Sequence, residues 1–433
     1  MIEILNSAYI FFLFICLSYF PINVCNKTFS NNSFNIKSLN LLINLNFLLI
    51  FSLMPYNILN HKYLITLIIV STLIISYKNL VRKIVKKKFF IENFIFFITF
   101  IILSSNILNN LYFEWDAQKF YFIKSSIFFQ GGIFSDLKTF EFNHFHPHFG
   151  QYIWAFFGKI GFIENEVFGR LFYLLIYCFS LLYLSSQINY KNYLYLAVFI
   201  LSILLTFEYK LFSGLQEIII FSLLIIVSIN LYNIYKKQSS LIDFFQCILI
   251  SNILIWTKAE GFVYSLIILI LLLFSPINYK KKLFTNILIL TLIIVKYLIY
   301  HFTEFNLDPR PDSYSLDYVL NLDFMTALSK LKTIILFLIY YLTINEIMIL
   351  NLIFLTLIYF INYKDFNSIK FTYIFLLLNF IFLIGAYILT SLDTEYYVRT
   401  TMDRLIFSTS GFYLISIIHF INFYKNDLKI KFK

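Results

Sequence analysis

The chain has 433 residues, of which 60% are hydrophobic and only 13% are charged. Soluble domains are about 45–50% apolar and about 25% charged, so this composition excludes a soluble enzyme, a disordered chain and a nucleic-acid-binding protein. The net charge is +11, and in a membrane protein such a surplus lies mainly in cytoplasmic loops. The composition therefore predicts an integral membrane protein with many spans.

Apolar runs of about 16 to 22 residues, long enough to cross the hydrocarbon core, recur along the chain. They predict an all-α, polytopic transmembrane bundle of about 11–14 spans. The expected spans are 4–20, 39–57, 63–77, 89–108, 167–186, 192–207, 215–235, 241–256, 262–277, 283–302, 345–361, 371–390 and 405–424. Two further apolar stretches, at 149–163 and 327–343, are candidates.

Basic connectors set the expected orientation, because Lys and Arg collect in cytoplasmic loops. Five segments belong on that side: Lys78–Lys88, Tyr235–Lys237, Tyr279–Lys282, Lys364–Lys370 and Lys425–Lys433. The outer face then receives the loops Asn109–His148, Thr303–Met325 and Ser391–Arg404 and the turns Glu208–Gly214 and Thr257–Gly261.

Successive connectors should lie on alternate sides of the membrane, and one apolar stretch conflicts with this rule. If 327–343 and 345–361 both crossed, the connector Lys364–Lys370 would emerge on the wrong face, so we expect 327–343 to lie on the outer surface as an interfacial helix.

The chain is then organised in three parts. Residues 1–88 are N-terminal spans with a basic loop, 89–302 form the core with the first outer loop, and 303–433 hold the acidic outer loop, the interfacial helix and the last spans.

The first outer loop opens with two carboxylates, Glu114 and Asp116, on either side of Trp115. The following residues, 116–129, have apolar residues on one face and Lys119 and Lys124 on another, which predicts an amphipathic helix at the membrane surface. There Asp116 could take a proton from an acceptor hydroxyl beside a lipid-anchored donor. The alternative is a helix N-cap.

Three histidines, His144, His146 and His148, alternate around Pro147 later in the loop. In an extended segment they point to one side, which suits Zn²⁺ with Glu141 as a fourth ligand. They could equally hydrogen-bond phosphate or sugar oxygens, or form a solvated turn. A divalent metal ion is the only cofactor that this pattern suggests.

The other outer segments contain further charged residues that are candidates for binding a substrate. Arg170 opens the span 167–186, and Lys258 and Glu260 share a tight turn, either as an ion pair or facing a cavity. Arg399 and Arg404, just before the last span, could clamp a phosphate by bidentate hydrogen bonds. The alternative is an ordinary surface pair with Glu395 or Asp403, which contributes little to stability.

Between Asn109 and Ser186 the chain resembles the type C membrane glycosyltransferases. The resemblance covers the acidic pair, the helix ending in Gly131-Gly132, the segment His146-Pro-His148-Phe-Gly and Phe168-Gly-Arg170. The family often has Pro-Pro-Leu where this chain has His-Pro-His. Thr257-Lys-Ala-Glu-Gly261 and Thr401-Met-Asp-Arg404-Leu also resemble segments of such enzymes.

The resemblance implies a multi-pass glycosyltransferase of the bacterial plasma membrane. It would move a sugar from a polyprenyl-phosphate donor to a hydroxyl on a glycan, a lipid or a protein, with inversion. Asp116 would be the general base, assisted by Glu114, and Arg170, Lys258, Glu260, Arg399 and Arg404 would bind substrate. The alternatives are an outer-leaflet polysaccharide polymerase or ligase and a non-enzymatic transporter of lipid-linked glycans.

Overall fold

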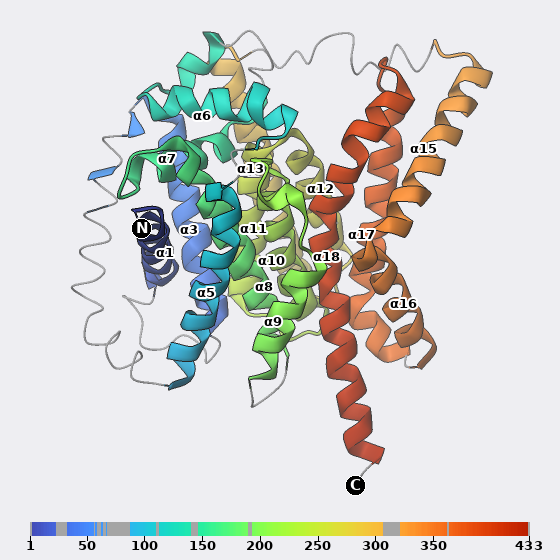
Figure 1. Ribbon diagram of the computed structural model, residues 1–433. Coiled ribbons are helices and arrows are strands. Elements are labelled where there is room, and N and C mark those ends of the chain that lie inside the picture. The colour runs from blue at the N-terminus through green and yellow to red at the C-terminus, as the bar shows by residue number, and fades with distance from the viewer. Residues whose placement is uncertain are drawn as a thin grey trace.

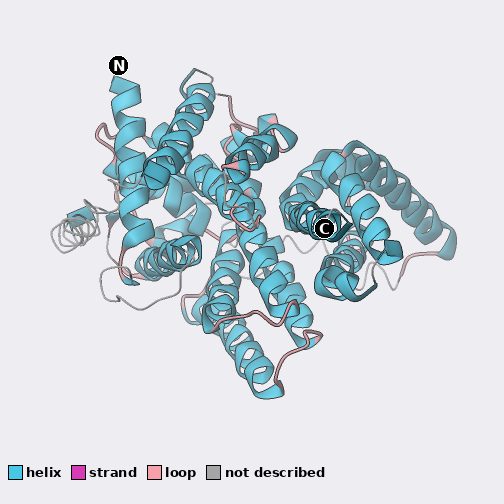
Figure 2. Cartoon of the chain, turned by 90° about the horizontal axis from the view of Figure 1, so that it is seen from below, coloured by secondary structure: helices cyan, strands magenta, loops and turns pink. Residues whose placement is uncertain are grey.

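A computed structural model of the chain describes residues 2–22, 33–55, 57–58, 62–63, 66, 87–109, 112–139, 146–188, 193–305, 321–361 and 363–431. These residues form helices and connecting turns, with no strand among them (Figures 1 and 2). Eight of the described helices are long and apolar enough to cross a membrane, which identifies a multi-pass membrane protein and confirms the all-α polytopic fold.

The α-helices follow the apolar runs of the sequence closely. They are α1 (Ile2–Tyr19), α3 (Ser33–Leu53), α5 (Lys87–Asn109), α6 (Phe122–Phe129), α7 (Phe149–Ile160), α8 (Leu171–Ser185), α9 (Leu194–Leu205), α10 (Glu217–Tyr235), α11 (Leu241–Thr257), α12 (Ala259–Leu273), α13 (Tyr279–Phe302), α15 (Phe324–Ile344), α16 (Glu346–Ile361), α17 (Tyr363–Ile388) and α18 (Thr394–Lys431). The expected span 63–77 lies almost entirely outside the described residues.

Four short helices join them. A π-helical turn, η1 (Ala117–Tyr121), precedes α6, and the 3₁₀ turns are η2 (Phe134–Thr139), η3 (Glu166–Arg170) and η4 (Tyr209–Leu211).

The core of the bundle is built around α8 and α10, which are buried almost completely. Both are apolar on every side, as expected of helices enclosed by other helices. Helix α10 packs against α8, α11 and α18, and Phe221 of α10 stacks on Phe407 of α18 with ring centroids 5.1 Å apart. In contrast, α13 and α15 leave most of their apolar surface exposed, which suits lipid contact.

The two ends of the bundle differ in which segments they carry (Figure 1). The end where α5 starts and α18 finishes also carries the basic segments 236–237, 279–282 and 363–370, and we call it the basic end. The opposite end carries residues 112–139, 206–216, 257–261 and 389–404, and we call it the loop end. This separation matches the alternation expected from the basic connectors.

Helices α15 and α16 descend one after the other along α18 (Figure 1). Lys330 of α15 donates a hydrogen bond to the carbonyl of Thr390, the Tyr341 hydroxyl donates to the carbonyl of Arg399, and Phe354 of α16 stacks on Phe420. The pair therefore makes one passage from the loop end to the basic end. This arrangement differs from the surface helix expected at 327–343, and it brings 363–370 to the basic end without one.

Helix α6 lies across the loop end, above α7 (Figure 1). The predicted surface helix at 116–129 is present as η1 and α6, and Lys119 is exposed on it. Lys124 is fully buried, however, and donates to the carbonyl of His146. The expectation that both lysines share a polar face was therefore wrong for Lys124, and burial lowers the pKa of its ammonium group to about 7.

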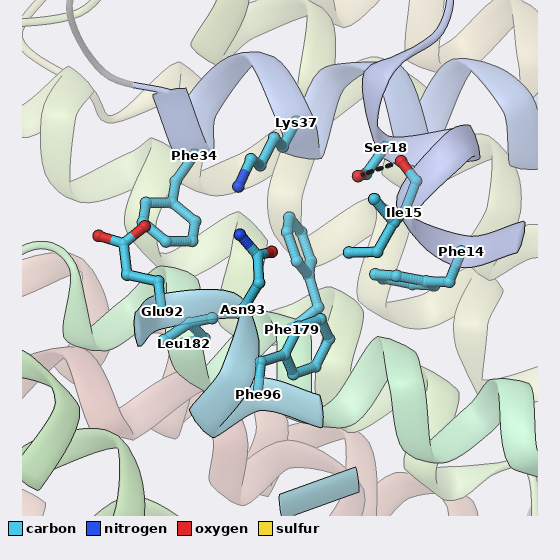
Figure 3. A pocket seen from close by; sticks show the side chains of 10 residues that line it. All are labelled: Phe14, Ile15, Ser18, Phe34, Lys37, Glu92, Asn93, Phe96, Phe179 and Leu182. Carbon is cyan, nitrogen blue, oxygen red and sulfur yellow. Dashed lines mark hydrogen bonds between the residues drawn. The ribbon is translucent and has the colours of Figure 1, made fainter. Parts of the chain in front are cut away.

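A small pocket opens between α1, α3, α5 and α8, near the basic end (Figure 3). Phe14, Phe96 and Phe179 line its apolar part, and Lys37 and Glu92 stand at its polar side. No carboxylate or cation of the loop end lines it, so the pocket is separate from the site described next.

Candidate functional site

Asp116 stands at the N-terminus of η1, where an aspartate would be expected to cap a helix. Its side chain makes no capping hydrogen bond. Instead, its Oδ2 accepts a hydrogen bond from Nη1 of Arg404, 288 residues later in the chain, at 2.5 Å. Within the described residues its Oδ1 accepts no hydrogen bond, so one carboxylate oxygen is left for another partner.

Five charged side chains form an unbroken series of alternating sign, which we call the ionic chain. Its members are Asp116, Arg404, Glu217, Lys258 and Glu260. Beyond the Asp116–Arg404 pair, Nε of Arg404 lies 3.9 Å from Oε1 of Glu217. Nζ of Lys258 is 2.9 Å from that same Glu217 oxygen and 3.2 Å from Oε1 of Glu260.

Four separate elements supply these side chains. Asp116 precedes η1, Glu217 is the first residue of α10, Arg404 lies in the third turn of α18, and Lys258 is the single extended residue between α11 and α12. The α11–α12 hairpin depends on Gly261, because a Cβ there would come 1.9 Å from the carbonyl oxygen of Leu254. No larger residue fits that backbone approach.

Two buried side-chain amides, those of Gln151 and Gln216, link the start of α10 to the α11–α12 hairpin and to the carbonyl of His148. In the orientation that satisfies their hydrogen bonds, the Gln216 side chain donates to the carbonyl of Thr257 at 2.8 Å and accepts from the backbone N–H of Gln151 at 3.1 Å. Gln151 in turn donates to the carbonyl of His148 at 2.8 Å. Glu217 and Lys258, the neighbours of Gln216 and Thr257, are thereby fixed beside one another.

Exposure separates one member of the ionic chain from the other four. The side chains of Arg404 and Lys258 are 12% and 13% exposed, those of Asp116 and Glu260 are 22% and 23% exposed, and that of Glu217 is 1% exposed. A molecule arriving from the loop end can therefore touch four members but not Glu217. Burial opposes the charge on Lys258, but attraction to Glu217 and Glu260 outweighs it and raises the lysine pKa well above its usual value.

A second ionic group borders the first through neighbouring residues of α18. Lys210 of η4 contacts Asp403 at 2.7 Å and Glu208 at 2.6 Å. Burial lowers the pKa of Lys210, but the hydrogen bonds to both carboxylates raise it more, so the net shift is upward. Because Asp403 and Arg404 are consecutive, one turn of α18 holds both the segment before η1 and the connector that contains η4.

Glu114 lies beside the ionic chain without joining it. Its backbone N–H donates to the carbonyl of Ser213 at 3.0 Å, and its side chain accepts a hydrogen bond from the Tyr112 hydroxyl at 3.3 Å. Next to Ser213, Gly214 has a φ of +80°, and a Cβ there would meet the ring of Trp154 at 3.0 Å. These contacts fix the backbone on both sides of Asp116.

Arg170 is buried behind these segments and contacts no member of the ionic chain. Its guanidinium lies 4.3 Å from the ring centroid of Phe113 and 5.6 Å from that of Trp154, and Nη1 donates to the carbonyl of Phe212 at 2.7 Å. Planar guanidinium stacks well on aromatic rings. Arg170 therefore holds the 206–216 connector against α7 and the segment before η1.

Arg399 and Arg404 of α18, which were predicted to bind one phosphate together, lie in different surroundings. Arg404 belongs to the ionic chain, whereas Arg399 is 63% exposed and bound to Glu395 one helical turn earlier. The structure thus brings together Asp116, Lys258, Glu260 and Arg404 but not Arg399, Arg170 or Glu114.

The histidines do not gather into a metal site within the described residues, which contain no suitable cluster of three or more His, Cys, Asp or Glu side chains. His144 lies outside those residues, as does Glu141. The ring of His148 is buried, and its Nε2 shares a hydrogen bond with the Ser52 hydroxyl at 2.9 Å. The ring centroids of His148 and Phe134 lie 4.6 Å apart. Burial, followed by repulsion from Lys124 and Lys296, lowers the His148 pKa well below its usual value.

Sequence reasoning missed Glu217 as a site residue. The only available signal was a carboxylate at the very start of an apolar helix, where its charge also suits the helix dipole. The comparisons with known proteins add nothing here, since no family model, no curated protein and no solved structure matches the chain.

Proposed function

We propose that the chain is a membrane glycosyltransferase that moves a sugar from a polyprenyl-phosphate donor to a hydroxyl acceptor, with Asp116 as the general base. The observation that carries the proposal is the pair formed by Asp116 and Arg404 at the loop end. A partly exposed carboxylate beside two partly exposed cations suits a reaction that removes a proton and releases a phosphate. The membrane would be the plasma membrane of a bacterium, with the loop end outside.

The transfer needs three events at one carbon atom. The acceptor oxygen bonds to the anomeric carbon while its proton passes to the free Oδ1 of Asp116. The bond between that carbon and the phosphate oxygen breaks on the opposite side, and the electron pair stays on the phosphate. The lipid phosphate leaves with one more negative charge, which Lys258 and Arg404 stabilise from positions 13% and 12% exposed.

The lipid carrier explains why a membrane bundle suits this chemistry. A polyprenyl chain is apolar and stays in the bilayer, so its phosphate is held at the level of the membrane surface. Helices α13 and α15 have long apolar faces that the rest of the protein does not cover, and the polyprenyl chain could pack against them. The glycan, lipid or protein that carries the acceptor hydroxyl would approach from the water side, where Trp115 and Tyr112 are exposed.

A transfer assay with purified protein tests the proposal. The substrates are polyprenyl-phosphate sugars of several kinds, supplied with membrane glycolipids as acceptors, and release of polyprenyl phosphate is the readout. Asp116→Asn keeps the shape of the side chain but removes the base, so we expect turnover to fall by about 100-fold or more. Glu114→Gln, next to it but outside the ionic chain, should lose much less.

Unchanged turnover in Asp116→Asn would refute the assignment of the base. Transfer by no combination of donors, together with movement of a lipid-linked glycan across vesicles that contain the protein, would favour the transporter. Addition of one sugar repeat after another to a growing glycan would favour the polymerase.

A further inference from the structure

The ionic chain carries an excess of negative charge. Three carboxylates face two cations, so one negative charge remains when all five groups are ionised. The excess comes from Glu217, which lies between the two cations and contacts both of them with the same oxygen, Oε1. A site whose only task was to bind phosphate as tightly as possible would not place a carboxylate there.

Glu217 is also an expensive residue to keep. Its side chain is 1% exposed, and its second oxygen, Oε2, has no hydrogen-bond partner within the described part of the chain. A buried carboxylate oxygen without a partner costs free energy, and the contacts of Oε1 with Lys258 and Arg404 compensate for burying the charge. Any effect of this charge on a substrate must act through Lys258 and Arg404, because substrate cannot reach Glu217.

On the basis of the proposed function, we infer that Glu217 is a positioning residue that weakens the hold of Lys258 and Arg404 on the departing lipid phosphate. The donor is a phosphodiester with one negative charge. The product is a phosphate monoester, which carries up to two negative charges near neutral pH. Two cations alone would bind the product more tightly than the donor, and turnover would end in a product complex.

The buried carboxylate corrects this imbalance. Its repulsion acts on every anion in the site, but it acts about twice as strongly on a dianion as on a monoanion at the same place. It also holds both cations on one oxygen, so they keep their positions when the phosphate leaves. Glu217 thus sets the order of affinities that lets product go and donor enter.

The experiment measures equilibrium binding of radiolabelled polyprenyl phosphate and of a non-hydrolysable polyprenyl phosphodiester to the purified full chain. Glu217→Gln should bind the monoester about tenfold more tightly, bind the diester only a few times more tightly, and turn over more slowly. Glu395→Gln is the matched control, because it makes the same chemical change on an exposed residue of α18. It should bind both lipids as the wild type does.

The outcomes separate this inference from the function on which it rests. Wild-type protein that binds neither lipid would overturn the proposed function. Wild-type protein that binds them, with Glu217→Gln binding the monoester equally or more weakly, would overturn the role of Glu217 alone. If Glu217→Gln does not fold, Glu260→Gln decides the matter: it removes a negative charge from the other side of Lys258 and should tighten monoester binding about threefold, and no tightening would overturn the inference.

Discussion

The two ends of the helix bundle hold their charges in different ways. At the loop end, Asp116 and Arg404 meet across 288 residues of sequence, and the other members of the ionic chain come from two further places. Near the basic end, two buried charges contact aromatic groups instead: the Lys37 ammonium lies 5.0 Å from the ring centroid of Phe34, and Glu92 accepts a hydrogen bond from the Tyr195 hydroxyl.

This difference favours the loop end as the place of the proposed reaction. Ionisable groups inside a membrane bundle are costly, and they persist where pairing or function compensates for the cost. At the loop end the charges are partly exposed and linked to one another, so a substrate can exchange contacts with them. Near the basic end Lys37 and Glu92 are buried at a pocket whose lining includes four phenylalanines (Figure 3), which suits a structural role.

The largest expected effect sharpens this comparison within one helix. Arg404→Ala removes a cation that contacts Asp116 and Glu217, so two carboxylates are left facing each other without it. We expect kcat/KM for sugar transfer to fall by about 100-fold or more. Arg399→Ala removes only an exposed pair with Glu395, and kcat/KM should stay within about twofold of wild type.

Both variants are compared in the same assay, with thermal unfolding in detergent to show that each has folded. Equal losses in the two variants would mean that the exposed arginine is as important as the one in the ionic chain. The ionic chain would then no longer define the functional site.

The contrast between these arginines also shows what the sequence can and cannot predict. The spans were predictable because each depends on a contiguous apolar run, and α10, α13 and α17 agree with the expected ranges to within a few residues, apart from an earlier start of α17. Arg399 and Arg404 lie five residues apart in similar local sequence. Only the packing of α18 against α10 and the segment before η1 decides that Arg404 reaches Asp116 and Arg399 does not.

Glu217 and Lys124 show the same limit from opposite directions. Glu217 stands at a helix start, as many ordinary carboxylates do, and its importance comes from Lys258 and Arg404, which are distant in sequence. Lys124 fits the polar face of an isolated amphipathic helix, yet α6 rotates it inward toward the carbonyl of His146. In both cases tertiary packing overrides what the local pattern indicates.

A smaller effect concerns the support behind the ionic chain. Arg170→Met keeps much of the apolar stem but loses the stacking on Phe113 and the hydrogen bond to the Phe212 carbonyl. An unpaired buried carbonyl costs about 1–3 kcal/mol, so we expect the thermal unfolding midpoint in detergent to fall by a few degrees. Arg170→Lys keeps the charge but not the planar stack, and it should recover only part of the loss.

Because Arg170 touches no member of the ionic chain, its variants should keep donor affinity among the molecules that remain folded. A large loss of donor affinity at an unchanged unfolding midpoint would instead make Arg170 a substrate-binding residue, as the family resemblance implies.

The smallest expected effect is at the other end of the molecule. Glu92→Gln removes a charge from the pocket in Figure 3 but keeps an oxygen that can accept the Tyr195 hydrogen bond. The hydrogen bond is kept, so the free energy of unfolding should change by no more than about 1 kcal/mol. Sugar transfer should stay within about twofold of wild type, because no member of the ionic chain is altered. Lys37→Met, which removes the neighbouring cation, serves as a second variant of the same pocket. A loss of transfer comparable to that of Arg404→Ala, in folded protein, would break the comparison between the two ends, because it would make the charges near the basic end part of the reaction.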